Sequence, residues 1–308
     1  MHRIGKGIGY TKTMPIIQVI VLAIVQGLAE LLPVSSSAHV VIAEKLMGLD
    51  PSSPQMTLLL VMLHTGTMFA VIAYFWKTWK KAYFSSSGAF QRFAILVVWA
   101  TVLTGIIGEA IKKVIEKTLF AGVEKAEIEQ LFSHLELIAP ALAAAGVIIL
   151  IAGLIERRQA INASMEAPRT SVTLSQAGWM GIVQGLALPF RGFSRSGSTI
   201  STGMLVGARK EAAERFSFAL AVVLTPPVVA IEAMRLLKAS HAAAATGAAI
   251  DLHASVASSV LGMVFSFMAG LAALKWLSSW LESGRWYLFG IYCLVASAGV
   301  FYLHTQGY

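Results

Sequence analysis

The chain has 308 residues, of which 56% are hydrophobic and 13% are charged; its mean hydropathy is +0.72 and its formal net charge is +8. This composition excludes an ordinary soluble domain, in which about a quarter of the residues are charged. The positive charge does not indicate a nucleic-acid partner, because the basic residues stand in short clusters between apolar runs rather than along one soluble face.

Eight apolar runs follow one another along the chain, and a membrane span takes roughly 20 such residues. They predict an all-α polytopic membrane protein that forms a single membrane domain over residues 1–308. A cleaved signal peptide is the competing interpretation of the first run, but the stretch that follows it, "AELLPVSSSAH", has no clean small-residue cleavage site. The runs cover approximately residues 13–29, 57–76, 93–108, 137–155, 172–190, 216–231, 254–274 and 286–303.

The connections between the runs carry a charge bias. Basic clusters at residues 77–81, with Arg92, and at Arg157 and Arg158 predict cytoplasmic connections. The stretch 109–136 mixes lysines with glutamates, so we place it on the outer side.

One polar stretch occurs twice. "QGLAELLPVSSSAH" begins at Gln26, and "QGLALPFRGFSRSGST" begins 158 residues later at Gln184; this offset also aligns Ser36 with Ser194. The duplication predicts two repeated halves, approximately 14–155 and 172–305, each with a re-entrant or broken helical segment. An even number of spans in each half makes the halves parallel and an odd number inverts the second; the count of runs leaves this open.

The second polar stretch has the residue types of a phosphate-binding turn. Turns rich in serine and glycine that open a helix direct several backbone N–H groups at one point, where the helix dipole adds positive potential. Arg195 adds a planar pair of donors for phosphate oxygens. An arginine inside a bilayer costs at least ~2.5 kcal/mol on insertion scales, which favours a bound anion or a carboxylate partner. The candidate phosphate ligands are Ser194, Ser196, Thr199 and the nearby Arg191, with Ser35 from the first stretch.

The first polar stretch offers a carboxylate, serines and a histidine. Gln26 and Glu30 are four residues apart and share a helical face, so with phosphate oxygens and water they suit Mg²⁺ or Ca²⁺. His39 is a candidate general base, a base that activates Ser36, or itself a phosphoryl acceptor. We therefore predict catalytic roles for Glu30, Ser36, His39 and Arg195.

Structural roles compete with some of these assignments. Serines after a helix break often cap the next helix, which is the simpler role for Ser35 and Ser196. His64 is a single histidine on an apolar run, and we interpret it as structural. Glu30, His39 and Arg195 are interpreted as functional, because ionisable side chains inside a membrane are rare and usually serve a function.

Together the two stretches resemble the motifs of the undecaprenyl pyrophosphate phosphatase family, bacterial membrane enzymes associated with bacitracin resistance. The first motif of that family has Glu or Gln, three residues, Glu and then a "PVSS..H" stretch; the second is a Pro-Gly-x-Ser-Arg-Ser-x-x-Thr stretch, here "RGFSRSGST". Two positions depart from the pattern. Gln26 stands at the first acidic position and removes one negative metal ligand, and Arg191 replaces the proline.

The resemblance implies hydrolysis of undecaprenyl diphosphate to undecaprenyl phosphate and phosphate, which recycles the lipid carrier of peptidoglycan synthesis. It also implies a divalent cation, a bacterial inner-membrane location with the active site open to the outer side, and inverted repeats with paired re-entrant segments. The expected partners are a polyprenyl diphosphate and membrane lipids, without nucleic acid, and a homodimer is left open.

A polyprenyl-phosphate transporter or flippase is the alternative function, because duplicated halves with broken helices are also typical of transporters. The nucleophile stays open between Ser36, His39 and water. The identity of the metal and the preferred polyprenyl chain length stay open as well.

Overall fold

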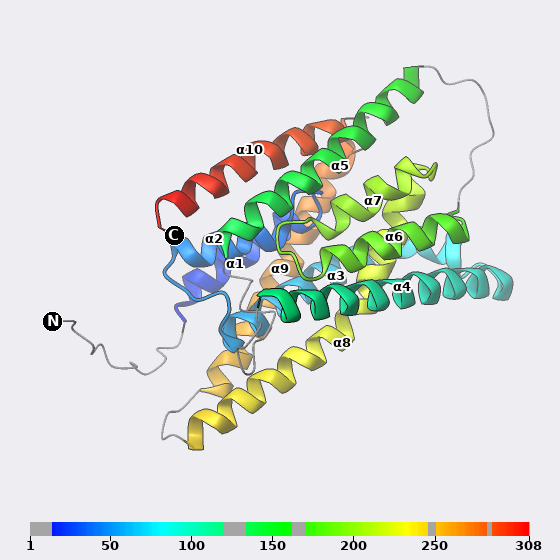
Figure 1. Cartoon of the computed structure of the whole chain (residues 1–308). Helices are drawn as coiled ribbons and strands as arrows, with labels where there is room; N and C mark the ends of the chain where they lie inside the picture. Colours follow the sequence, from blue (N-terminus) through cyan, green and yellow to red (C-terminus); the bar gives the residue numbers. More distant parts are fainter. Residues whose placement is uncertain (1–13, 120–133, 162–170, 246–250, 282–284, 308) are drawn as a thin grey trace.

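The computed structural model describes residues 14–119, 134–161, 171–245, 251–281 and 285–307, and every regular element in these ranges is an α-helix (Figure 1). The first half contains α1 (Ile16–Glu30), α2 (Ser36–Leu46), α3 (Pro54–Tyr83), α4 (Ser87–Leu119) and α5 (Leu135–Ile161). The second half contains α6 (Leu174–Ala187), α7 (Arg195–Leu205), α8 (Lys210–Ala245), α9 (Leu252–Leu281) and α10 (Trp286–Thr305).

The helix order is the same in both halves: two short helices are followed by three long ones. Within the described ranges, six helices, α3 to α5 and α8 to α10, are long and apolar enough to cross a membrane. The other two predicted spans, 13–29 and 172–190, correspond to α1 and α6, which have 15 and 14 residues. At 1.5 Å per residue such helices are about 22 Å long, less than a hydrocarbon core of about 30 Å. Six of the eight predicted spans thus correspond to helices long enough to cross a membrane, and the two shorter runs form the first arms of the short helix pairs.

Proline accounts for the break after each first arm. Pro33 follows α1 and Pro189 follows α6. Because proline has no backbone N–H, it cannot continue the helical hydrogen-bond ladder. The chain turns at these positions and starts a second short helix.

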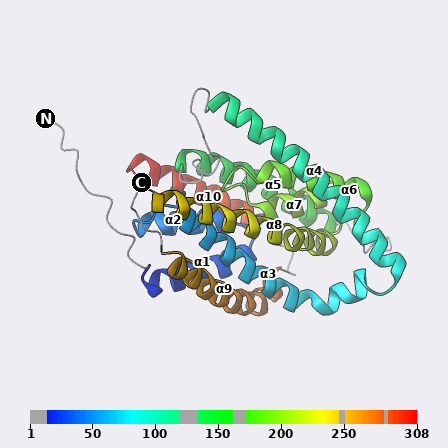
Figure 2. The same cartoon turned by 90° about the horizontal axis from the view of Figure 1, so that it is seen from below.

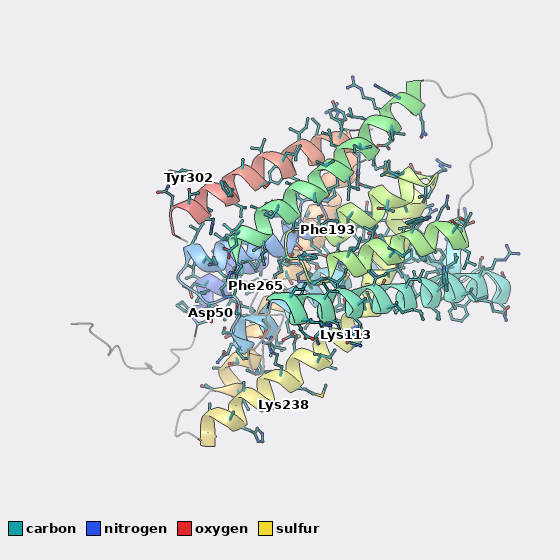
Figure 3. The ribbon with its side chains drawn as sticks, viewed as in Figure 1. Asp50, Lys113, Phe193, Lys238, Phe265 and Tyr302 are labelled. Atoms are coloured by element: carbon teal, nitrogen blue, oxygen red, sulfur yellow. The ribbon has the colours of Figure 1, made fainter. Side chains whose placement is uncertain are left out.

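The two halves run in opposite directions along the bundle. α3 runs away from the end where α1 begins and α10 finishes, whereas α8 runs toward that end, and both views agree (Figures 1 and 2). α1 and α2 enter from that end, and α6 and α7 enter from the other (Figure 1). The turns of the two pairs meet near the middle of the molecule. Phe193, in the second turn, lies there, whereas Tyr302 of α10 lies toward one end (Figure 3).

Helices of the two halves interlock. α1 packs on α9 and α6 packs on α4, so each first arm lies against the fourth helix of the opposite half. α5 packs along α10, and α3 packs along α8 and α9. The approach of α3 to α9 is close: a Cβ on Gly66 would lie 2.1 Å from the backbone oxygen of Met263. Small residues at such contacts are typical of membrane helices, which associate through packing rather than hydrophobic exclusion.

Replacing Gly66 by alanine is expected to destabilise the protein by about 1–3 kcal/mol, because the two backbones must separate to admit the methyl group. The measurement is the thermal unfolding of the purified protein in detergent. Gly105→Ala is the matched control, since a Cβ on Gly105 would meet no atom within 4 Å. Equal unfolding temperatures for the two variants would contradict the close packing of α3 on α9.

Candidate functional site

Two serine turns meet at the centre of the molecule. Ser35 and Ser194 stand at the N-cap positions of α2 and α7, where the Ser194 side chain alone accepts a capping hydrogen bond. Both residues have left-handed backbone conformations, with φ of 66° and 46°. Such a conformation costs a non-glycine residue of order 1–3 kcal/mol, so the surrounding contacts must hold it. The Ser194 hydroxyl accepts hydrogen bonds from the backbone N–H groups of Ser35, at 3.2 Å, and Gly197, at 3.3 Å. One side chain therefore joins the turn of the first half to the turn of the second.

A glycine permits the close contact between the turns. A Cβ on Gly197 would lie 2.9 Å from the carbonyl oxygen of Pro33 and 2.7 Å from the Ser194 hydroxyl oxygen. Gly192, in the second turn, has φ of 109°, which L side chains rarely adopt, and a Cβ there would lie 2.6 Å from the Ile138 carbonyl oxygen. The glycines of "RGFSRSG" thus fit the turn against α5 and against the first turn.

The structure shifts the alignment of the two turns by one residue. Residues 31–35 separate α1 from α2, whereas residues 188–194 separate α6 from α7. The equivalent N-caps are Ser35 and Ser194, not Ser36 and Ser194 as the constant offset of 158 residues predicts. Ser36 therefore corresponds to Arg195, and each is the first residue of its short helix.

Glu30, the last residue of α1, is the centre of the site, and only 3% of its surface is exposed. Its Oε1 accepts a hydrogen bond from Nη2 of Arg195 at 2.7 Å, which forms an ion pair between the two halves. Its Oε2 accepts hydrogen bonds from the Ser36 hydroxyl and from Nε2 of Gln26, the latter at 2.9 Å. The carboxylate partner expected for the intramembrane arginine is therefore Glu30.

His64 of α3 also reaches Glu30. Its Nε2 lies 3.2 Å from Oε2 of Glu30 and 3.5 Å from the Ser36 hydroxyl oxygen, and its Nδ1 lies 2.9 Å from the Leu60 carbonyl oxygen. Since a carbonyl only accepts, Nδ1 carries a hydrogen, and Nε2 is the nitrogen that faces the carboxylate. The sequence suggested a structural role for His64 and did not predict this contact with the Glu30 carboxylate. The sequence signal that could have indicated this contact is the presence of an ionisable side chain inside a predicted membrane span.

His39 is held by other partners. Its Nδ1 lies 2.8 Å from the Ser35 carbonyl oxygen, and its Nε2 lies 2.7 Å from the hydroxyl of Tyr292, on whose ring it stacks at 5.7 Å between centroids. Both ring nitrogens are occupied by these contacts, so the structure places His64 rather than His39 beside the Ser36 hydroxyl. The role of His39 as the base for Ser36 stays a prediction without support from this geometry.

The remaining predicted phosphate ligands differ in their surroundings. Ser196 is buried near the start of α7. The Thr199 hydroxyl lies 2.6 Å from the Ser217 hydroxyl of α8 and donates to the Arg195 carbonyl at 2.8 Å, so it packs between helices. Arg191 interacts electrostatically with the buried carboxylate of Glu44 in α2.

The site is suited to an anion. α2 and α7 begin at Ser36 and Arg195, so the positive ends of two helix dipoles adjoin the Arg195 guanidinium. The first N–H groups of a helix have no intrahelical acceptor. In α7 the Gly197 N–H donates to the Ser194 hydroxyl, so the N–H groups of Arg195 and Ser196 are the candidates for phosphate oxygens. Arg195 is 23% exposed, so its guanidinium remains accessible while it contacts Glu30.

The polar groups around Glu30 also fit a divalent cation that is shared with a phosphate. Oε1 of Gln26 is buried without a hydrogen-bond partner, next to the Glu30 carboxylate. Within the described part of the chain, no group of three or more His, Cys, Asp and Glu residues could hold a metal ion alone. Mg²⁺ commonly takes one or two carboxylates and completes its coordination with substrate phosphates and water. Glu30 and Gln26 fit that pattern.

The fold and the site define an integral membrane protein in which two re-entrant turns bring Glu30, Ser36 and Arg195 together in one buried polar site. The family model described as "Bacitracin resistance protein BacA" matches residues 19–299. The chain belongs to this family.

Similar proteins match nearly the whole chain. It is 56% identical over 288 residues to "Undecaprenyl-diphosphatase 2" of Acinetobacter baylyi, covering 93% of this chain and 97% of the relative. It is 33% identical over 306 residues to "Undecaprenyl-diphosphatase" of Desulfatibacillum aliphaticivorans, covering 92% and 97%. It is 32% identical over 299 residues to "Undecaprenyl-diphosphatase 2" of Burkholderia orbicola, covering 92% and 96%.

Proposed function

We propose that this protein hydrolyses undecaprenyl diphosphate to undecaprenyl phosphate and phosphate, which recycles the lipid carrier of peptidoglycan synthesis and supports bacitracin resistance. The observation that carries the proposal is the ion pair of Arg195 with Glu30 beside the Ser36 hydroxyl, at the start of two helices. These residues stand in the two motifs that the chain shares with the phosphatase family. The names of the relatives support the same reaction.

Arg195 is the residue that grips the phosphate to be transferred. Arg195 is the first residue of α7, and its guanidinium lies at the Glu30 carboxylate beside Ser36, so negative charge that builds up on the phosphoryl oxygens meets a donor already in place. Ser194 holds the turn in position through its hydrogen bonds to Ser35 and Gly197. Ser196 and Thr199 support the helix that presents this donor.

Ser36 is the nucleophile in the mechanism that this geometry favours. Its hydroxyl proton passes to Oε2 of Glu30, with Nε2 of His64 nearby to share it. The Ser36 oxygen bonds to the terminal phosphorus, and the bond from that phosphorus to the bridging oxygen breaks, which releases undecaprenyl phosphate. Water then attacks the phosphorus of the phosphoserine, and the bond from that phosphorus to the Ser36 oxygen breaks, which releases phosphate. The proton held by Glu30 returns to the Ser36 oxygen, while one proton of the water stays on the phosphate and the other passes to solvent. Direct attack by water, with the same proton acceptors, is the competing route.

A divalent cation, Mg²⁺ or Ca²⁺, would be held by Glu30 and Gln26 together with the substrate. When bound, the cation would offset the negative charge of the diphosphate oxygens. Glu30 thus contacts the Ser36 hydroxyl and adjoins the amide of Gln26.

The inner membrane is the proposed location, with the site open to the outer side. Basic residues gather at the end of the bundle where α3 meets α4 and α5 finishes, among them Lys77, Arg92 and Arg157. The positive-inside bias makes this end cytoplasmic. α1 and α2 enter from the opposite end, so the first re-entrant pair enters from the outer side (Figure 1).

Phosphate release from undecaprenyl diphosphate tests the proposal. The purified protein in detergent is expected to release phosphate with Mg²⁺ or Ca²⁺, to lose this activity in excess chelator and to regain it when the cation is restored, because the cation offsets diphosphate charge. The measurement is free phosphate over time, with heat-inactivated protein as control. Activity that survives the chelator would refute the cation requirement. Saturable binding without release would favour a transporter.

A further inference from the structure

A large cavity lies at the basic end of the bundle, away from the catalytic residues. Its volume is about 1060 Å³, and residues of α3, α4, α8 and the start of α6 line it. Glu30, Ser36 and Arg195 are not among its lining residues. The proposed reaction therefore leaves this cavity without a role.

The rim of the cavity is strongly basic. Lys77 and Lys81 of α3, Arg92 of α4 and Arg215 of α8 line it, whereas none of its lining residues, all within the described ranges, is acidic. The first three side chains are exposed, and Arg215 is half-buried and hydrogen-bonded to the Tyr83 hydroxyl. Four cationic side chains from three helices favour an anionic ligand. Because these lining residues include no carboxylate, the ammonium group of a zwitterionic lipid would have no partner of opposite charge among them.

The floor of the cavity is apolar. It includes the buried Val172 and Phe216, and Phe93, which stacks on Tyr83 with 4.1 Å between ring centroids. The apolar surface continues from the cavity along α4 through Ile95, which lines it, to Val98 and Val102, with exposed fractions of 60%, 61% and 48%. Residues three and four positions apart lie on one helical face, so this stripe leads from the cavity along the helix.

We propose that the cavity binds an anionic phospholipid of the adjacent leaflet. The phosphate of the lipid lies between Lys77, Lys81 and Arg92, and its glycerol and upper chains rest on Phe93 and Phe216. One acyl chain follows the apolar stripe of α4. Basic clusters beside membrane helices attract anionic headgroups, and here the cluster surrounds a cavity of ligand size rather than a flat surface.

The test removes the three exposed charges together. The variant Lys77→Gln/Lys81→Gln/Arg92→Gln is placed in nanodiscs that contain dioleoylphosphatidylglycerol and dioleoylphosphatidylcholine, and the lipids retained after gentle release are measured by native mass spectrometry. The natural protein is expected to retain phosphatidylglycerol in preference to phosphatidylcholine. The variant is expected to retain at least about tenfold less phosphatidylglycerol than the natural protein, since each cation near a headgroup contributes to binding.

The matched control removes three lysines from the other end of α4: Lys112→Gln/Lys113→Gln/Lys117→Gln. This control is expected to retain phosphatidylglycerol as the natural protein does, and both variants are expected to keep phosphatase activity. Equal retention by the two triple variants, or no preference between the lipids in the natural protein, would overturn the proposal. Displacement of phosphatidylglycerol by equimolar undecaprenyl phosphate would also overturn it and assign the cavity to the product. If the triple variant does not fold, Lys81→Gln and Arg92→Gln are each expected to give a smaller loss of the same lipid.

Discussion

Replacing Arg195 by alanine is expected to lower phosphate release from undecaprenyl diphosphate by roughly a thousandfold, the loss typical of a phosphoryl-stabilising arginine. The guanidinium contacts the same Glu30 carboxylate as the Ser36 hydroxyl, and its removal leaves charge on the transferred phosphoryl without a partner. The measurement is the rate of phosphate release at saturating substrate. Arg195→Lys is expected to recover little, because an ammonium group cannot offer two parallel donors.

The Arg195 experiment needs a control for folding, since alanine also leaves a buried carboxylate unpaired. Breaking such a pair typically costs about 3–5 kcal/mol. The double variant Glu30→Gln/Arg195→Ala is therefore expected to unfold at a higher temperature than Arg195→Ala and yet remain inactive. Arg209→Ala removes an exposed arginine near the end of α7 and is expected to leave activity unchanged. Natural rates in a folded Arg195→Ala variant would refute the site.

Replacing Ser36 by alanine is expected to reduce phosphate release by at least roughly a thousandfold, as removal of a nucleophile does in other enzymes. Its hydroxyl is hydrogen-bonded to Glu30 and lies 3.5 Å from His64, so it is the hydroxyl with proton acceptors at hand. Rapid acid quench of the natural enzyme, followed by mass spectrometry of the peptide that contains Ser36, is expected to detect a phosphoserine.

The adjacent serine provides the matched control for this substitution. Ser37→Ala makes the same chemical change one residue further along α2, a rotation of about 100° around the helix, and is expected to keep activity. A Ser36→Ala variant with natural turnover, without any trapped phosphoserine, would instead assign the attack to water. The variant His64→Ala does not distinguish attack by Ser36 from attack by water, because the same proton acceptors serve both routes.

Local sequence accounts for one side of the site. Gln26 and Glu30 stand one helical turn apart, and the contact between their side chains follows from that spacing. The capping role suggested for Ser35 and Ser196 is only partly confirmed: Ser35 stands at the N-cap of α2 without a side-chain cap hydrogen bond, and Ser194 rather than Ser196 caps α7. The charge bias of the connections agrees with the two ends of the bundle seen in the structure.

Local sequence does not predict features that depend on the length of a helix or turn, or on contacts between residues that are distant in the chain. The apolar runs of α1 and α6 were predicted to be membrane spans because hydropathy does not show where a helix ends and the chain turns back. The repeat offset misaligned the N-caps by one residue, because the second turn is longer than the first. His39, near Ser36 in sequence, bonds instead to Tyr292, whereas His64, 28 positions from Ser36, lies beside it.

By itself the sequence determined that this is an all-α membrane protein with a repeated polar stretch, because hydropathy, turn residues and motif spacing are local properties. Only the tertiary structure decided that Glu30 faces Arg195 across 165 positions, that Ser194 joins the two turns, and that His64 contacts Glu30. Such contacts depend on how α1, α3 and α7 are brought together by helices of the opposite half. The opposed directions of the halves turn two separate polar stretches into one site.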